Sequence, residues 1–255
     1  PVIVMVSCGG FKPGLGPFHA SSMESFAVHT PGLDVFMPSS AADAAGLLNA
    51  AFRSERPTIF FYPKSLLNDR ERAGPPDVEN QFVPIGKARP TRRGDSLTFV
   101  AWGNTVPLCE RAADVLAKAG APCDVLDLRS LSPWDEEGVL ESVRRTHHLL
   151  VAQEDNRTAS LASEVAAVVA ERGGGKVTIR RVDRSDTFIP FHFGNQLEVL
   201  PSFKRILEGA ASLLGGTVTW HAELAPEKGM YFVEAVGSSP SDESVTVIEW
   251  KVKAG

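Results

Sequence analysis

A loop rich in glycine and proline, residues 9–18, leads from the first apolar run of the chain to His19. Gly14 and Gly16 match the first two glycines of the GxGxxG dinucleotide fingerprint, but His19 occupies the third position. The chain also contains no Gly-Lys-Ser or Gly-Lys-Thr sequence, which a phosphate-binding P-loop requires. The loop therefore predicts neither kind of nucleotide site.

His19 is the residue of this loop that could carry out chemistry, because an imidazole can transfer a proton near neutral pH. It lies between an expected strand and an expected helix. Open α/β sheets bind ligands in such positions, beyond the carboxyl ends of their strands. The residues alone also allow a histidine that only hydrogen-bonds the backbone.

Other reactive side chains form weaker patterns. There is no GxSxG nucleophile elbow, which excludes a serine hydrolase of that type. His147 and His148 open an expected strand, so they point to opposite faces and cannot bind one metal ion together. Asp127 and Asp155 lie at expected strand ends, where we expect them to cap helices. We predict no metal site.

The composition narrows the possible classes of protein. The 255 residues include 31 acidic and 26 basic side chains, a formal charge of -5, which disfavours a nucleic-acid partner. No apolar run approaches the ~20 residues of a membrane span. The three cysteines form no CxxC pair, which excludes a cysteine zinc site and favours a reducing compartment.

The elements that must position His19 alternate between strands and helices. Residues 1–7 are expected to form a strand buried on both faces. Ser40 is expected to cap the second helix. The expected order is strand 1–7, helix 22–29, strand 33–37, helix 41–53 and strand 58–62.

A polar connection, residues 63–95, separates this part from a second alternating part. There we expect Ser132 to cap a helix with Pro133 in its first position and Asp135 in its third. The expected elements are strand 97–101, helix 106–118, strand 123–128, a helix to about 145, strand 148–153, helix 160–172, strand 177–182 and helix 199–214. This order predicts an α/β fold with parallel strands.

A series of short motifs with consistent gaps runs through residues 1–213. It resembles the β subunit of the thiamin-dependent decarboxylating component of 2-oxo acid dehydrogenase complexes, of the pyruvate and branched-chain type. The motifs are Gly14-Leu-Gly-Pro-Phe-His19, Ser22-x-Glu24, Pro31-Gly-Leu33, Met37-Pro-Ser39, Asp43-Ala-x-Gly46-Leu-Leu48, Pro57-Thr-Ile-Phe-Phe61, Pro84-Ile-Gly-Lys-Ala88 and Asp127-Leu-Arg-Ser-Leu-x-Pro133-Trp-Asp135.

The resemblance implies the end of a pyrimidine-binding thiamin domain at 1–74, a linker at 75–95 and a transketolase C-terminal-like domain with a mostly parallel sheet at 96–214. It also implies oxidative decarboxylation of a 2-oxo acid and reductive acylation of a lipoyl group. In this family a histidine at the position of His19 faces the substrate and is catalytic. Phe18 and Ser21 would then face the substrate or the lipoyl group.

The chain departs from the family pattern at two places. The family usually has His-Ser-Gln where this chain has His19-Ala20-Ser21, so an amide that would orient His19 is missing. Ser54 stands where an Asp often binds a monovalent cation, and we do not predict that ion.

The cofactor implied by the resemblance is thiamin diphosphate with magnesium. In the family the glutamate that activates the thiamin pyrimidine precedes the segment that matches Pro1, and the Gly-Asp-Gly motif for the diphosphate belongs to another domain. We therefore expect the cofactor to bind only together with those domains, and the isolated chain to be inactive.

Residues 215–255 have a β-rich composition, and 243–255 are similar to the first third of a lipoyl domain. An ordinary β tail is the alternative. The expected partners are an α-type diphosphate-binding domain or subunit, the acyltransferase core, a lipoyl domain and a second copy bound through the C-terminal domain. The expected location is cytoplasmic, or the mitochondrial matrix in a eukaryote. A transketolase-like carboligase and a non-catalytic dimerisation and docking module remain as alternative functions.

Overall fold

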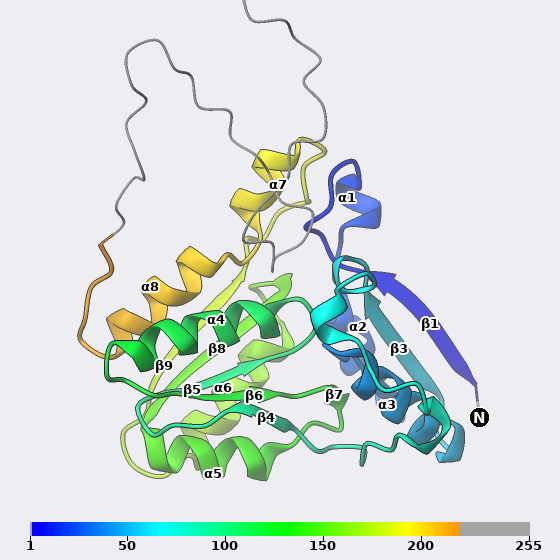
Figure 1. Cartoon of the computed structure of the whole chain (residues 1–255), viewed down its shortest axis with the longest axis horizontal. Coiled ribbons are helices and arrows are strands. Elements are labelled where there is room, and N and C mark those ends of the chain that lie inside the picture. Colours follow the sequence, from blue (N-terminus) through cyan, green and yellow to red (C-terminus); the bar gives the residue numbers. More distant parts are fainter. Residues whose placement is uncertain (1, 220–255) are drawn as a thin grey trace, which may run out of the picture.

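The computed structural model describes residues 2–219, which form two β-sheets flanked by helices (Figure 1). The first sheet contains β1 (Ile3–Cys8), β3 (Thr58–Pro63) and β2 (Asp34–Phe36) in the order β1-β3-β2, all parallel. The predicted α/β fold with parallel strands is confirmed.

Strand β1 differs from its prediction. The run of Val and Met residues indicated burial on both faces, but Val4 is 46% exposed and Met5 is 50% exposed. Among the described residues, β1 hydrogen-bonds only to β3 and so forms an edge of the sheet. The prediction of a fully buried strand is therefore wrong.

The helices of this part are close to their predicted positions. Helix α1 (Gly16–His19) is short and was not predicted, whereas α2 (Glu24–Val28) and α3 (Ala41–Arg53) were. The side chain of Ser40 accepts a hydrogen bond from the backbone N–H of Asp43, which confirms it as the N-cap of α3.

The connection between the two parts is more ordered than its composition suggests. It contains the 3-10 helices η1 (Lys64–Leu66), η2 (Arg70–Arg72) and η3 (Val78–Asn80). It ends in β4 (Arg89–Arg92), an unpredicted strand that pairs antiparallel with β6 (Asp124–Asp127).

The second sheet has the order β4-β6-β5-β8-β9, and all its strands except β4 are parallel. Its other strands are β5 (Thr98–Ala101), β6 (Asp124–Asp127), β8 (His148–Asn156) and β9 (Thr178–Arg184). Helices α4 (Thr105–Lys118) and α8 (Phe203–Leu213) pack together along the sheet, and α5 (Glu136–Thr146) and α6 (Leu161–Arg172) form a second pair (Figure 1).

The segment before α5 also departs from expectation. Residues Ser130–Ser132 form strand β7, which leaves the second sheet region and pairs antiparallel with β2 of the first sheet. Ser132 therefore cannot cap α5. Asp135 caps it instead, because its side chain accepts a hydrogen bond from the backbone N–H of Gly138.

The predicted helix 199–214 is shorter than expected. It begins only at Phe203, after Pro201, with Ser202 as its N-cap. A separate helix, α7 (Phe193–Val199), precedes it and was not predicted.

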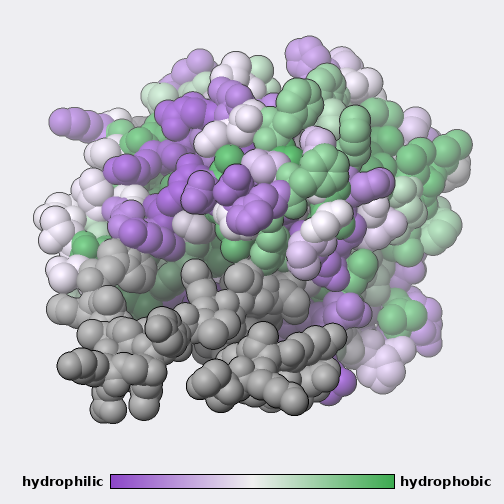
Figure 2. Space-filling model, turned by 90° about the horizontal axis from the view of Figure 1, so that it is seen from above, coloured by the Kyte–Doolittle hydropathy of each residue, from purple (hydrophilic) through white to green (hydrophobic). Residues whose placement is uncertain are grey.

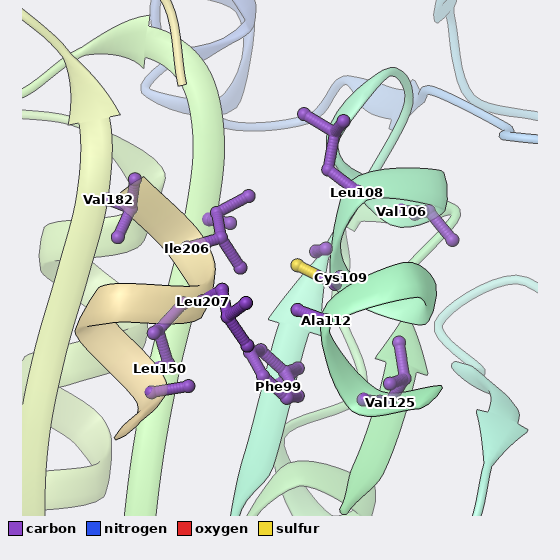
Figure 3. Close-up of a cluster of buried hydrophobic side chains, with 14 of the residues drawn as sticks. Phe99, Val106, Leu108, Cys109, Ala112, Val125, Leu150, Val182, Ile206 and Leu207 are labelled. Carbon is purple, nitrogen blue, oxygen red and sulfur yellow. The ribbon is translucent and has the colours of Figure 1, made fainter. Parts of the chain in front are cut away.

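The hydrophobic core lies on both faces of the second sheet. On one face Phe99 and Leu150 pack among α4 and α8, where they meet Cys109, Ile206 and Leu207 (Figure 3). On the other face a second cluster joins Val100 and Val151 to Val35 and Phe61 of the first sheet. The two sheets therefore share buried apolar contacts. Within residues 2–219 no helix is both long and apolar enough to cross a membrane.

Candidate active site

The loop after β1 is held by the second half of the chain. The backbone N–H of Gly10 donates a hydrogen bond to Oε1 of Glu154, which lies on β8. Nε2 of Gln196, on α7, donates to the carbonyl oxygen of Lys12 at 3.3 Å. The loop therefore joins the carboxyl ends of β1 and β8.

Apolar contacts fix the same loop. Phe11 and Ala20 are buried in the hydrophobic cluster of the second sheet. Gly16 has a φ of +62°, and a Cβ added there would lie 2.3 Å from Cε1 of Phe191. Glycine is required at this position because both the backbone conformation and the aromatic ring exclude a side chain.

The three predicted site residues lie at the tip of this loop. Phe18 is 87% exposed, and His19 is also exposed. Ser21 is half-buried, and its hydroxyl donates a 2.6 Å hydrogen bond to the carbonyl of Pro17, which stabilises α1. Nζ of Lys64 donates a hydrogen bond to the carbonyl of His19.

Two further aromatic side chains are exposed in the segment before α7, Phe188 at 80% and Phe191 at 69%. Phe191 is the ring that contacts Gly16, so this segment lies beside the His19 loop. Seen from above, the molecule presents hydrophobic and hydrophilic surface side by side (Figure 2). The segment that carries His19 therefore has exposed apolar side chains both within it, at Phe18, and next to it, at Phe191.

Below the loop, a glutamate and a tryptophan connect the two parts of the chain. Trp102 Nε1 donates a 2.7 Å hydrogen bond to Oε1 of Glu24, and both side chains are buried. Burial raises the pKa of Glu24 to about 8, and the nearby Asp155 carboxylate adds to the rise. Glu24 therefore carries a proton over much of the neutral pH range.

Glu154 is the second buried carboxylate. Besides Gly10, it accepts a 2.6 Å hydrogen bond from Nδ2 of Asn104, whose Oδ1 accepts one from the hydroxyl of Ser65. Burial raises the pKa of Glu154 to about 6, and the hydrogen bonds from Gly10 and Asn104 oppose the rise. This carboxylate is thus mostly ionised at pH 7.

Asp155 is the third buried carboxylate. Its Oδ2 atom accepts a 3.1 Å hydrogen bond from the backbone N–H of Ser25, in the first turn of α2. Arg184 lies 3.7 Å away. The predicted capping role is therefore fulfilled for a helix 130 residues earlier in the chain, and not for the helix that follows.

Asp127, the other aspartate predicted to cap a helix, does not cap one. Its Oδ2 atom accepts hydrogen bonds from the hydroxyl of Ser39 at 2.6 Å and from Arg89 at 3.3 Å. Burial raises the pKa of Asp127 to about 6. Asp127 therefore connects β6 to the residues before α3. Neither of these partners belongs to the His19 loop.

The loop that leads to His19 is thus held by one of three buried carboxylates, of which sequence reasoning singled out Asp155 but not Glu24 or Glu154. Glu24 was visible only as part of the Ser22-x-Glu24 motif, and Glu154 follows the apolar run 149–152 in a short polar stretch. The signal that could have found Glu154 is its position at the carboxyl end of a parallel strand. Within residues 2–219, no three His, Cys, Asp or Glu side chains are placed to hold a metal ion.

Two family models match successive parts of the chain. Residues 1–70 match the model of the transketolase pyrimidine-binding domain, and residues 86–203 match that of the transketolase C-terminal domain. The chain therefore belongs to the thiamin-dependent, transketolase-like family. Strands β1, β2 and β3 lie within the first match, and all strands of the second sheet lie within the second match, as does β7 of the first sheet.

Within this family the chain is similar to β subunits of 2-oxo acid dehydrogenases, as its motifs predicted. It is 36% identical over 181 residues to the 2-oxoisovalerate dehydrogenase subunit beta of Dictyostelium discoideum, covering 70% of this chain and 48% of that protein. It is 38% identical over 210 residues to the pyruvate dehydrogenase E1 component subunit beta of Leifsonia xyli subsp. xyli (strain CTCB07), covering 82% and 61%.

The chain spans about half the length of the first of these relatives. A solved structure titled "Split gene transketolase, inactive beta4 tetramer" matches 85% of this chain and 67% of its own, with a TM-score of 0.66 and 22% identity. That likeness supports the fold alone. The predicted lipoyl-like segment, 243–255, lies outside the described residues.

Proposed function

We propose that this chain is a β-type component of a thiamin-dependent 2-oxo acid dehydrogenase. The observation that carries the proposal is the placement of His19 on a loop held between the pyrimidine-binding and C-terminal domains. The β-subunit relatives, at 36% and 38% identity, support the same class of reaction. Because these relatives act on different 2-oxo acids by name, the substrate class is a short-chain 2-oxo acid.

The role proposed for His19 is proton transfer at the acyl group as it passes to the lipoyl acceptor. An exposed imidazole can approach a substrate carried on another domain, and imidazole is the side chain best suited to proton transfer near neutral pH. Phe18 and the other exposed aromatic side chains would line the approach. Ser21 would act by stabilising the α1 turn through its hydrogen bond to Pro17.

Thiamin diphosphate, when bound, supplies the electron sink for loss of CO2 from the 2-oxo acid. The described residues do not fit its magnesium-diphosphate group, since they contain no metal-holding cluster. We therefore propose that the α-type partner binds this group and that residues 2–219 supply the part of the active site that contains His19. The acyltransferase core, a lipoyl domain and a second copy of the chain are the further partners proposed.

The compartment proposed is the cytoplasm, or the mitochondrial matrix in a eukaryote. Its support is the state of the cysteines, since Cys8, Cys109 and Cys123 are all free and buried. Free thiols are typical of reducing compartments.

The test is reconstitution of the full chain with its α-type partner. Decarboxylation of pyruvate and of branched-chain 2-oxo acids would be followed with a dye acceptor and, separately, with a lipoyl domain as acceptor. We expect His19→Ala to lower lipoyl acylation by about 100-fold while dye reduction falls much less. The control His29→Ala changes another exposed histidine, whose side chain makes no described hydrogen bond, and leaves both activities unchanged.

Two outcomes would contradict the proposal. If the complete assembly decarboxylates none of these acids, the reaction class is wrong. If His19→Ala lowers both activities equally, its role in acyl transfer is wrong. Transfer to a sugar acceptor instead of a lipoyl group would favour the carboligase alternative.

A further inference from the structure

A hollow lined by arginines lies at the outer edge of the second sheet. Its volume is about 480 Å³, within the range of small-molecule sites. Arg180 and Arg181 line it from β9, Arg157 from the loop after β8, and Arg205 from α8. Four arginines from three separate segments therefore line one space.

These guanidinium groups have no carboxylate partners among the described residues. Arg181 donates to the carbonyl of Arg157 at 2.9 Å and to the hydroxyl of Ser163. Arg205 donates to the carbonyl of Leu200 at 2.9 Å and to that of Asp183 at 2.8 Å. All these acceptors are uncharged, so the bonds fix the side chains without neutralising them.

The acidic groups nearby do not balance the arginines. Glu208 lines the hollow and forms an ion pair with Lys204 at 4.0 Å. Asp183 is a buried residue of β9, and burial raises its pKa to about 6 while Arg181, Arg157 and Arg205 oppose the rise. Hydrogen bonds lower the pKa of Asp186, which also lies close enough to Arg157 for that guanidinium to lower it further. Four positive and three negative charges therefore leave a surplus of one, in a chain whose formal charge is -5.

The pKa of Arg205 reflects the positive charges near it. Burial lowers the pKa of Arg205, and the Arg157 guanidinium lowers it further, against the effect of Asp183. Like charges held together are unfavourable unless an anion lies between them. Arg180 extends over α8, where a Cβ added to Gly209 would lie 3.4 Å from its Cδ and Nε atoms. Gly209 thus leaves room for that side chain to lie along the hollow.

We propose that this hollow binds a small phosphorylated ligand carrying at least two negative charges, such as a diphosphate ester. Guanidinium groups match phosphate oxygens through paired hydrogen bonds, and several of them suit a dianion better than a single carboxylate. Ile179 and Val182 provide an apolar wall for the remainder of the ligand. The volume favours a soluble small molecule over a macromolecule.

The test is calorimetric titration of the full chain with inorganic pyrophosphate. We expect saturable binding with a Kd below about 1 mM. The double variant Arg157→Ala/Arg180→Ala should weaken it at least about tenfold, because each lost phosphate contact removes a charged hydrogen bond. These two side chains donate no hydrogen bond within residues 2–219, so their loss leaves the internal bonds of Arg181 and Arg205 in place.

The matched control is Arg70→Ala, which removes an exposed arginine from η2 and should leave binding within about twofold of the parent. No saturation, or equal binding by the double variant, overturns the proposal. Equal binding of citrate overturns the phosphate assignment, and sedimentation with phosphatidylserine vesicles overturns the small-molecule assignment. The hollow includes neither His19 nor the buried carboxylates, so these outcomes are independent of the decarboxylation proposed above.

Discussion

The indole of Trp102 donates a 2.7 Å hydrogen bond to the carboxyl group of Glu24, and both side chains are buried where the two domains meet. The other oxygen of that carboxyl group, Oε2, has no hydrogen-bond partner among the described residues. A protonated carboxyl group tolerates this arrangement better than a carboxylate does. The protonation of Glu24 is therefore part of what holds the domains together.

The first prediction concerns the pH dependence of stability. The pKa of Glu24 is about 8 in the folded chain and near 4.5 when exposed, so the folded state binds the extra proton between these values. Stability contributed by this group therefore falls as pH rises from about 4.5 to 8 and levels off above.

Glu24→Gln removes this titration while keeping an oxygen for Trp102. The difference in unfolding free energy between variant and parent should grow in favour of the variant across pH 4.5 to 8, on the order of a few kcal/mol. Urea denaturation at a series of pH values measures it. A difference that stays constant with pH would contradict the raised pKa.

The second prediction isolates the hydrogen bond itself. Trp102→Phe keeps an aromatic ring but removes the Nε1–H donor, which leaves Glu24 Oε1 buried without its partner. We expect a loss of about 1–3 kcal/mol. Above pH 8 the same change should cost less in the Glu24→Gln background, because the indole then donates to a neutral amide oxygen and not to a carboxylate. Equal costs in both backgrounds at that pH would contradict a hydrogen bond strengthened by the charge of Glu24.

The third prediction separates backbone strain from a side-chain clash. Gly14 and Gly16 both have positive φ, +77° and +62°, but a Cβ at Gly14 meets nothing within 4 Å. Each change to Ala should cost about 1–2 kcal/mol for the left-handed backbone. Gly16→Ala should cost about 1–3 kcal/mol more, because its Cβ overlaps the Phe191 ring.

Thermal unfolding of the two glycine variants provides the comparison. Adding Phe191→Ala to Gly16→Ala should recover the additional stability that Gly16→Ala loses compared with Gly14→Ala, since the ring that causes the overlap is gone. If the two glycine variants are equally stable, the contact between the His19 loop and the Phe191 segment is not as described.

The fourth prediction concerns the support of His19. Lys64→Met removes the hydrogen bond to the His19 carbonyl but keeps most of the apolar stem. We expect faster amide hydrogen exchange in residues 9–21 and little change in global stability, because the bond is local. Lys118→Met, at the exposed end of α4, serves as the control. Unchanged exchange in the loop would mean that Lys64 does not hold it.

The fifth prediction tests the core that supports the site. Phe99 is fully buried on β5, between α4 and α8 (Figure 3). Phe99→Ala should lower the unfolding free energy by about 3–5 kcal/mol, since it leaves a cavity. Phe52→Ala, at a side chain 67% exposed, should change it by about 0.5 kcal/mol or less. Similar effects from both changes would contradict this placement.

Most regular elements could be predicted from the sequence because they have clear local patterns. Helix α3 and its Ser40 cap are examples, since the cap and the helix formers are adjacent in the chain. The structure differs from the prediction where pairing between segments far apart in the sequence determines which element forms. Strand β7 has only three residues and forms because β2 lies beside it. The same pairing displaces the start of α5 from Ser132 to Asp135.

In the candidate site, too, local features could be predicted and long-range contacts could not. His19 could be located from its loop and from the family motifs, because both are local features. The Glu24–Trp102 and Gly10–Glu154 contacts join residues 78 and 144 positions apart, and no spacing rule connects them. A buried carboxylate is also indistinguishable by sequence from a solvated one, so its pKa appears only with the packing.

The crossing of β7 into the first sheet makes the boundary between the two domains unsuitable for truncation. A polypeptide ending at residue 95 would lack β7 and leave the outer edge of β2 unpaired. Such an edge is free to pair with other chains, so this fragment should aggregate. The complementary fragment would carry the three residues of β7 without the strand that orders them. Each domain is therefore an incomplete folding unit, and deletion studies should keep residues 130–132 with the first sheet.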